Sequence, residues 1–379
     1  MNEWKEYKIK DITSRITSGG TPKSSEVSYY DGTIPWLNTK EINFNRITKT
    51  ERYITEEGLN NSSAKWIPKG SVIVAMYGAT AAKVAYSLID LTTNQACCNL
   101  IIDEDKANSQ FVYYYIQSSY EELLNLACGA AQQNLSVGVI GDFPISLPPL
   151  DEQKQIASIL SSLDDKIDLL NRENATLEAM AETLFRQWFI EEAKEDWEKG
   201  KLGEICEYAK EKADIANIDR NTYITTENMC SNKQGVVPPS SVPENIKVTI
   251  YSPDDILLSN IRPYFKKLWL SDRNGGCSND VLCIRSKSKI FKYFVYYTIR
   301  QDEFFDYVML GSKGSKMPRG DKHHIMNWPI QKPPKQMLEL FNEFVLRSIG
   351  KMQNNNRQIL CLEKQRNTLL PKLMSNTNV

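Results

Sequence analysis

Histidine is scarce in this sequence, which contains only the neighbours His323 and His324. None of the eight cysteines belongs to a Cys-x-x-Cys pair, so the spacing of zinc ligands is missing. Gly-x-Gly-x-x-Gly and P-loop strings are absent, as is the Asn/Asp-Pro-Pro-Tyr string of amino-methyltransferases. No Ser, Cys and His arrangement matches a nucleophilic triad. We therefore expect no catalysis by this chain alone, no metal site, and no cofactor bound to it.

Long apolar runs are missing as well. No stretch approaches the length of a transmembrane helix, and no signal-peptide pattern opens the chain. Two of the cysteines, Cys97 and Cys98, are adjacent, which suits reduced thiols better than a disulfide framework. We therefore expect a cytoplasmic protein that does not contact a membrane.

Neither sign of charge is in excess. The net charge of −1 gives no global argument for nucleic-acid binding, so any such argument must rest on local surfaces. At 379 residues the chain is long enough for two or more domains, each with its own core.

What the sequence does contain is a long helical stretch after Leu147. Pro148 and Pro149 end whatever precedes them, and Asp151 is a candidate N-cap. Beyond it, residues recur in alternating steps of three and four, which indicates a coiled-coil seam with one polar position. The seam positions are Ile156, Leu160, Leu163, Ile167, Leu170, Asn174, Leu177, Ala181, Leu184 and Trp188. Such a helix cannot bury its own apolar stripe and needs a partner helix.

A second stretch of the same kind follows the Pro-Pro pair at 333–334. Its seam positions are Leu338, Phe341, Val345, Ser348, Met352, Asn355, Ile359, Leu362, Arg366, Leu369 and Leu373. We predict that the two helices run antiparallel, with paired residue numbers that add to 529. The pairs predicted by this register are Ile156 with Leu373, Leu170 with Ile359, Leu184 with Val345, Asn174 with Asn355, and Ala181 with Ser348.

The polar layer of this seam supports the proposed register. Two core asparagines that meet can hydrogen-bond and fix the register, whereas the alternative is an asparagine at a solvated helix end. Charge favours the same pairing. Residues 151–195 carry five Lys and Arg against eleven Asp and Glu, whereas residues 334–379 carry seven against three. Opposite net charges favour one helix lying on the other, although each exposed pair contributes only tenths of a kcal/mol.

The chain also contains an internal repeat. Phe111-Val112-Tyr113-Tyr114 recurs as residues 294–297, an offset of 183. Residues 69–84 resemble residues 253–268 at an offset of 184. The glycine, isoleucine and proline positions of the segment 129–149 recur in 314–334 at an offset of 185, and the start of the chain resembles the segment from Trp197. The order along the chain is therefore domain, helix, domain, helix.

These observations predict an α+β fold: two similar globular α/β domains joined by two long antiparallel helices that form a coiled coil, with a pseudo-two-fold internal repeat. The predicted boundaries are 1–147 for the first domain, 148–195 for the central helix, 196–332 for the second domain and 333–379 for the C-terminal helix. We expect one domain at each end of the helical rod. Half-sites on duplex DNA have the same two-fold relation, and dimeric DNA readers use it.

The strongest local indication of DNA binding lies in the second domain. Residues 285–322 carry nine Lys and Arg against four Asp and Glu. Within them, the loop 313–320 has the flexible basic character that suits phosphates, although a solvated charge run is the alternative. The candidate contacts are Lys313, Lys316, Arg319 and Lys322. Replacing Lys316 and Arg319 by alanine is expected to weaken DNA binding.

The matching loop of the first domain is uncharged. Its Gln132, Gln133 and Asn134 could bond adenine edges in the major groove, or form a plain polar turn. Two further candidate groups suit phosphate, guanine edges or stacking. One is Tyr77 and Lys83 with their counterparts Arg262, Tyr264, Lys266 and Lys267, and the other is the turn containing Ser18, Gly19, Thr21 and Lys23. We assign the repeated tyrosine pairs 113–114 and 296–297 to the core, because they lie in apolar helical stretches.

The tandem repeat, with Leu147-Pro-Pro-Leu-Asp-Glu-Gln-Lys-Gln-Ile-Ala157 before a long helix, resembles the specificity subunits of type I restriction-modification systems. The resemblance covers essentially the whole chain. The second copy departs from it, because Pro333-Pro-Lys-Gln-Met337 lacks the Leu-Asp-Glu-Gln string. In that family the globular parts are target-recognition domains, and the helices are the central and C-terminal conserved regions. The family has no fixed set of base-reading residues.

The resemblance implies a DNA sequence-recognition subunit that reads a bipartite, asymmetric double-stranded target, one half-site per domain, across an unread spacer. It also implies two modification subunits that use S-adenosylmethionine, and two restriction subunits that hydrolyse ATP with Mg and cut DNA. The chain would scaffold these subunits and hold none of their cofactors. A different class of function is a non-DNA adaptor with paired binding modules on a helical spacer. A steep salt dependence of duplex binding would distinguish DNA recognition from the adaptor.

Overall fold

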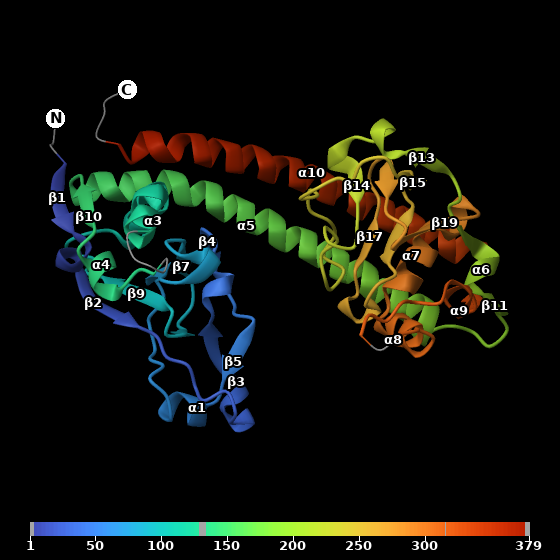
Figure 1. Cartoon of the computed structure of the whole chain (residues 1–379), viewed down its shortest axis with the longest axis horizontal. Coiled ribbons are helices and arrows are strands. Elements are labelled where there is room, and N and C mark those ends of the chain that lie inside the picture. The colour runs from blue at the N-terminus through green and yellow to red at the C-terminus, as the bar shows by residue number, and fades with distance from the viewer. Residues whose placement is uncertain (1–3, 129–133, 315, 376–379) are drawn as a thin grey trace. The chain divides into compact units, whose positions relative to one another are not determined.

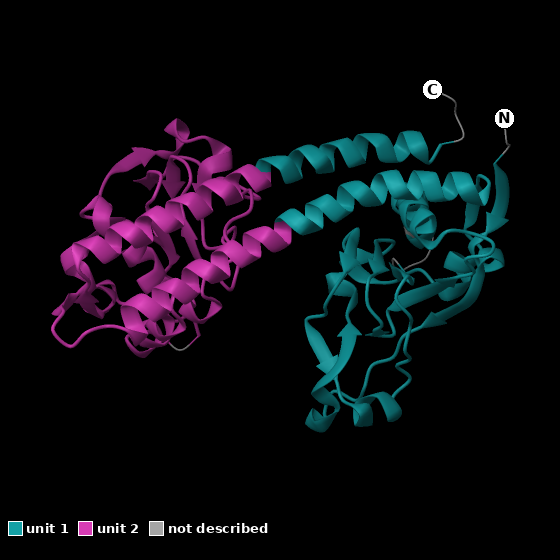
Figure 2. Ribbon diagram, turned by 180° about the vertical axis from the view of Figure 1, so that it is seen from behind, with its two compact units in different colours: residues 1–170, 357–379 teal, residues 171–356 magenta. Residues whose placement is uncertain are grey.

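A computed structural model describes residues 4–128, 134–314 and 316–375 (Figure 1). Packing divides the chain into two compact units, which are Met1–Leu170 with Arg357–Val379 as unit 1, and Asn171–Asn356 as unit 2 (Figure 2). Each unit contains one α/β domain and a part of each of the two long helices. We describe the units one at a time.

The domain of unit 1 is built on a five-stranded sheet with the strand order β2-β9-β6-β7-β4. A three-stranded sheet, β5-β3-β8, and the antiparallel pair β1-β10 complete it. The elements are β1 Lys5–Lys8, β2 Thr13–Ser18, β3 Tyr30–Leu37, β4 Asn45–Ile47, β5 Arg52–Ile54, α1 Glu56–Asn60, β6 Val72–Ala75, β7 Val84–Ser87, β8 Thr92–Thr93, β9 Cys97–Ile102, α2 Ser109–Ser118, α3 Tyr120–Cys128, α4 Val137–Gly141 and β10 Pro144–Leu147.

The domain of unit 2 repeats this topology. Its sheet β12-β19-β16-β17 matches β2-β9-β6-β7 strand for strand, and the pair β11-β20 matches β1-β10. A second sheet has the order β13-β15-β18-β14. The elements are β11 Glu198–Lys201, α6 Leu202–Ile205, β12 Cys206–Tyr208, β13 Lys212–Asp214, β14 Tyr223–Ile224, β15 Lys247–Tyr251, β16 Ile256–Ser259, β17 Leu268–Leu270, β18 Gly275–Cys277, β19 Val281–Ser286, α7 Lys292–Arg300, α8 Asp302–Leu310, α9 Lys322–Met326 and β20 Pro329–Lys332. The repeat predicted from the sequence is therefore confirmed in the fold.

The repeated tyrosine pairs belong to the cores, as expected. Tyr113 and Tyr114 on α2 and Tyr296 and Tyr297 on α7 are all buried. Each helix packs on the sheet of its own domain, so the recurring Phe-Val-Tyr-Tyr string is a packing motif.

The two long helices are α5, Leu150–Arg186, and α10, Lys335–Leu373. A short π-helical segment, Gln187–Glu191, continues α5. Asp151 is not the N-cap that the sequence suggested. The amide of Gln153 already donates to Pro149 O at 3.0 Å, so the helix begins earlier and Asp151 lies in its first turn. There its negative charge interacts favourably with the helix dipole.

The antiparallel register of α5 and α10 is found in both units. In unit 1, Ile156 and Leu373 share one hydrophobic cluster, and Leu170 and Ile359 share another. In unit 2, Asn355 Nδ2 donates to Asn174 Oδ1 at 2.9 Å. The other predicted layers of unit 2 also agree, because Leu184 and Val345 share a cluster and Ala181 and Ser348 are both buried.

Ion pairs hold each domain against its own part of α5. In unit 1, Arg46 on β4 is paired with Asp165 at 2.7 Å and with Asp168, and only 7% of its side chain is exposed. In unit 2, Arg300 at the end of α7 is paired with Glu178 at 2.6 Å and with Glu182, again with 7% exposure. A buried arginine must be paired, so each contact fixes how a domain sits on the helix.

Gln153 explains what the Leu-Asp-Glu-Gln string does in unit 1. Its side chain is buried, and its amide nitrogen donates to Pro148 O at 2.8 Å. Its Oε1 accepts from the backbone amide of Asn108, which caps α2. One side chain therefore joins the Pro-Pro bend to the start of α2. In the second copy Leu338 stands at the matching position, so this joint is present only in unit 1.

Candidate nucleic-acid interface

In unit 1, three predicted loops meet at one end of the main sheet. Ser18 ends β2 opposite Cys98, and Ala75 ends β6 opposite Cys97, so both strands stop where β9 begins. Just beyond β6, Tyr77 forms an isolated antiparallel bridge with Asn134. The side chains of Tyr77 and Asn134 are both exposed there. Gln132 and Gln133 lie outside the described residues.

The turn after β2 is fixed tightly against the same end of the sheet. A Cβ on Gly19 would stand 2.2 Å from Thr93 O, so only glycine fits there. Thr21 contacts Gln95, the residue next to Ala96, whose carbonyl accepts from the amide of Met76. Ser18, Thr21 and Lys23 are exposed, and Lys23 is paired with Glu26 at 3.0 Å.

Unit 2 repeats this arrangement at the level of single hydrogen bonds. Ile261 forms a bridge with Arg319, as Tyr77 does with Asn134. Gly320 N donates to Asn260 O at 3.1 Å, matching Leu135 N to Met76 O at 2.9 Å. The residue offsets are the 184 and 185 of the sequence repeat. The structure therefore brings the predicted loops 262–267 and 313–319 together.

The turn beyond the bridge keeps its backbone conformation in both copies. Arg262 and Lys266 have positive φ angles, both 50°, and they flank the 3₁₀ turn Pro263–Phe265. Their counterparts in unit 1 are Gly78 with φ 75° and Ala82 with φ 65°. Only glycine adopts this region without strain, so the arginine at 262 is held in a conformation that costs energy.

The basic residues of the unit 2 loops differ in their partners. The exposed Lys313 is paired with the half-buried Asp321 at 3.0 Å, and the exposed Arg319 with the half-buried Asp280 at 3.2 Å. The side chains of Arg262 and Lys316 are exposed and form no hydrogen bond or ion pair within the part of the chain that the structure describes. These two cations are the best placed to meet a phosphate or a guanine edge.

The remaining predicted lysines of these loops contact other residues of their own domains. Lys266 is paired with Asp302 at 3.0 Å, and Lys267 Nζ donates to Thr226 O at 2.6 Å. In unit 1, Lys83 Nζ donates to Asn43 Oδ1 at 2.7 Å. Lys322 lies at the first position of α9, with its Nζ 5.7 Å from the Tyr208 ring.

Exposed apolar side chains stand among these cations, and only one of them was predicted from the sequence. Tyr264 is 48% exposed, while Phe265 and Met317 are 38% and 48% exposed. Arg262 N donates to Pro318 O at 2.8 Å, which places Met317 beside the aromatic turn. The sequence feature that could have identified Phe265 and Met317 is their position next to predicted basic residues. Side chains of this kind contact thymine methyl groups or stack on bases.

The hydrogen bonds and the ion pair that Asp321 forms at the start of α9 lower its pKa to about 2. The main cause is the backbone amide of His324, which donates to Asp321 Oδ1 at 3.0 Å, and the Lys313 ammonium adds to it. Asp321 is therefore ionised at neutral pH and fixes the end of the basic loop.

The described ranges also bear on the expectations about metals, membranes and cysteines. They contain no group of three or more His, Cys, Asp and Glu side chains that could hold a metal ion. Within the same residues, no helix has the length and apolar character needed to cross a membrane. The cysteines at 97, 98, 206, 230, 277, 283 and 361 are free thiols.

Comparisons with known proteins agree with this geometry. A family model described as "Type I restriction modification DNA specificity domain" matches residues 1–179. The type I restriction enzyme MjaIX specificity subunit of Methanocaldococcus jannaschii is 28% identical over 416 aligned positions, which cover 98% of this chain and 93% of that protein. The EcoR124I/EcoR124II specificity subunit of Escherichia coli is 27% identical over 165 positions, covering 42% of this chain and 41% of that protein.

A solved structure has the same fold. The crystal structure of a type I restriction-modification S subunit from M. genitalium aligns with a TM-score of 0.57 and 15% identity, covering 100% of this chain and 97% of that one. Residues 1–179 therefore match a type I specificity domain, and the whole chain is similar in sequence to a type I specificity subunit and in fold to a type I S subunit.

Proposed function

We propose that this chain reads a bipartite, asymmetric DNA target, with one half-site recognised by each domain. The observation that carries the proposal is the repeated loop pair at the end of each main sheet, where Tyr77 bridges Asn134 in unit 1 and Ile261 bridges Arg319 in unit 2. The same backbone frame presents different side chains in the two copies, which supports two different half-site sequences.

The two surfaces would differ in how much of their DNA binding comes from contacts with phosphates and how much from contacts with bases. In unit 2, Arg262, Lys316 and Arg319 supply positive charge for phosphates and guanine edges. In unit 1, the bridge residues Tyr77 and Asn134 are uncharged, which suits base edges and stacking. Binding through unit 2 therefore depends more steeply on salt than binding through unit 1.

We further propose that the chain catalyses nothing itself and scaffolds the other subunits of a restriction-modification complex. The partners would be two modification subunits and two restriction subunits. S-adenosylmethionine, ATP and Mg would be held by those partners and not by this chain. The named relatives are specificity subunits of type I restriction enzymes, which supports this assignment.

The test is duplex binding by the chain assembled with its modification subunits, measured by fluorescence anisotropy between about 50 and 200 mM salt. A DNA-recognition subunit gives a steep loss of affinity with salt, because counterions are released from contacted phosphates. It also prefers one sequence over a shuffled duplex. A flat response without sequence preference would contradict the proposal and favour the protein adaptor.

A further inference from the structure

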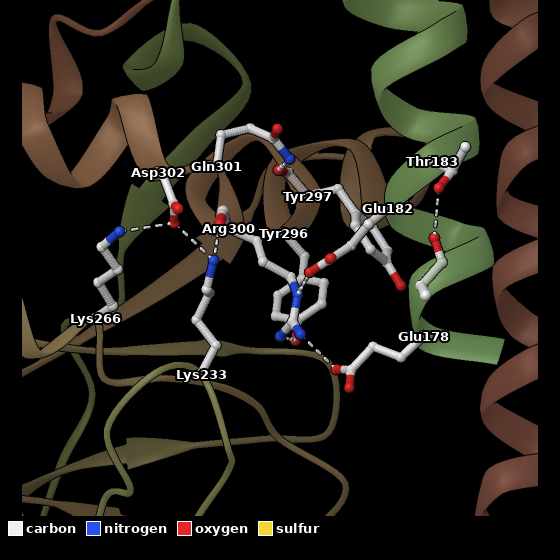
Figure 3. Close-up of polar contacts among 11 residues, drawn as sticks. Glu178, Glu182, Thr183, Lys233, Lys266, Tyr296, Tyr297, Arg300, Gln301 and Asp302 are labelled. Carbon is white, nitrogen blue, oxygen red and sulfur yellow. Dashed lines mark hydrogen bonds and ion pairs between the residues drawn. The ribbon is translucent and has the colours of Figure 1, made fainter. Parts of the chain in front are cut away.

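Two lysines in unit 2 converge on a single carboxylate oxygen. Lys233 Nζ lies 2.8 Å and Lys266 Nζ 3.0 Å from Asp302 Oδ1 (Figure 3). Asp302 is the first residue of α8, where the helix dipole also favours negative charge. Its carboxylate therefore joins two segments of the chain that are not adjacent in sequence.

Both segments are turns with strained backbone. Lys266 and Arg262 have left-handed conformations on either side of the aromatic turn, and Lys233 has φ 61°. Backbone hydrogen bonds hold the two turns together, because Lys233 N donates to Lys266 O at 2.8 Å and Asn232 N to Phe265 O at 2.9 Å. Like charges on the two lysines would repel each other in this packing without a shared anion.

The same cluster reaches α5. Lys233 Nζ also donates to Arg300 O at 3.2 Å, and the Arg300 guanidinium is paired with Glu178 and Glu182 on α5 (Figure 3). Arg300 Nη1 also donates to the hydroxyl of Tyr296 at 3.0 Å. A continuous set of polar contacts therefore runs from the exposed turn 262–266 through Asp302 to the long helix, all within unit 2.

We propose that Asp302 is a positioning residue for DNA recognition, which holds the turn 262–266 in its strained form so that Arg262 and Tyr264 meet the bases. The inference rests on the proposed function. It assigns Lys266 and Lys233 to this support and not to phosphate contacts. In unit 1 the matching positions are Ser119 and Ala82, so the support belongs to the copy whose turn carries arginine and lysine in place of glycine and alanine.

Removal of the Asp302 carboxylate is expected to change target affinity in the direction opposite to the one that electrostatics alone predicts. A carboxylate beside a DNA-binding surface repels phosphate, so its removal alone is expected to strengthen binding to every duplex. If Asp302 instead preserves the geometry of the turn, its removal frees two lysines for non-specific contacts and lets the turn relax. Affinity for the target then falls while affinity for other sequences rises.

The test uses Asp302→Asn in the chain assembled with its modification subunits. The target duplex carries the methylated motif found in host DNA, and a shuffled duplex is the reference. We expect the ratio of target to shuffled affinity to fall by about tenfold, because two charge-assisted contacts that hold the turn are lost. Asp302→Glu keeps the carboxylate and is expected to retain most of the ratio.

Glu303→Gln is the matched control. It removes one negative charge from the next residue, and the Glu303 side chain forms no hydrogen bond or ion pair in the described part of the chain. Its ratio should equal that of the wild type, and thermal unfolding should confirm that all three variants are folded. An unchanged or increased ratio for Asp302→Asn would overturn the inference alone. If the wild type itself fails to distinguish the two duplexes, the proposed function fails and this inference with it.

Discussion

Asn355 donates a hydrogen bond from its Nδ2 atom to Oδ1 of Asn174, 2.9 Å away, across the two long helices. The same nitrogen also donates to Glu173 Oε2 at 2.9 Å. Asn355 is fully buried, and its own Oδ1 has no partner among the described residues. This layer therefore costs stability and specifies the register of the helices.

Replacing both asparagines by leucine tests whether this polar layer lowers the stability of the helices. Asn174→Leu with Asn355→Leu is expected to stabilise the helices by about 1–2 kcal/mol, because a buried amide with an unsatisfied oxygen becomes an apolar contact. Urea denaturation followed by circular dichroism measures the change. Asn354→Leu, on the exposed neighbour, should alter stability by less than about 0.5 kcal/mol. Destabilisation by the double variant would contradict this account of the layer.

The sequence could predict this register because its signals are local and periodic. Leucine and isoleucine at steps of three and four define each seam, and the polar positions 174 and 355 align only when paired numbers add to 529. The domain repeat was predictable for a similar reason, since Phe111–Tyr114 recurs intact in a second core helix.

The details of the candidate site could not be predicted in the same way. Asp302, Lys233 and Lys266 are far apart in the sequence and belong to no motif, so their meeting depends on tertiary packing. The charge count over 285–322 overstated the basic surface, because Arg300 is buried against α5 and so unavailable to DNA. Composition does not distinguish a paired cation from a free one.

The ion pairs of the buried Arg300 in unit 2 predict that removing the two glutamates and removing the arginine have unequal effects on stability. Converting Glu178 and Glu182 together to glutamine leaves the Arg300 charge, only 7% exposed, without an anion, and is expected to cost about 3–5 kcal/mol. Arg300→Met removes the charge itself and leaves two partly exposed carboxylates that water can solvate, so it should cost less. Urea denaturation of both variants provides the comparison. A larger loss for Arg300→Met would refute the argument.

Gln153 offers a test of the joint between the Pro-Pro bend and α2. Gln153→Leu leaves Pro148 O and the amide of Asn108 without their partner, which is expected to cost about 1–3 kcal/mol. Gln155→Leu places the same side chain at an exposed position of the same helix turn and should have little effect. Thermal unfolding of the two variants separates the cases, and equal stability would show that the joint contributes nothing.

The basic loop of unit 2 should set part of the salt dependence of DNA binding. Lys316→Ala with Arg319→Ala is expected to weaken binding by the assembled complex and to lower the salt slope by about one to two units, as phosphate contacts are lost. Lys289→Ala is the matched control. It removes an exposed lysine from the same basic stretch but lies beyond the opposite end of β19. An unchanged slope in the double variant would remove the loop from the interface.

The carboxyl of Asp321 should titrate near pH 2, below its ordinary range, as its contacts with His324 N–H and Lys313 indicate. Because the folded-state pKa is lowered, the stabilisation is present above the ordinary aspartate pKa and is lost as the pH falls toward about 2. Carbon-13 NMR of labelled aspartate measures this. Lys313→Ala should raise the pKa only partly, because the backbone amide is the larger cause; full restoration would contradict that order.

The central claim is that two related domains read two separate halves of one DNA target. Sequencing of methylated bases in cells that express this chain with its modification subunits tests it most directly. The account predicts a motif of two specified halves around an unspecified spacer of constant length. It also predicts that the triple variant Arg262→Ala, Lys316→Ala and Arg319→Ala relaxes only one half. A single continuous motif, or a variant that alters both halves alike, would contradict it.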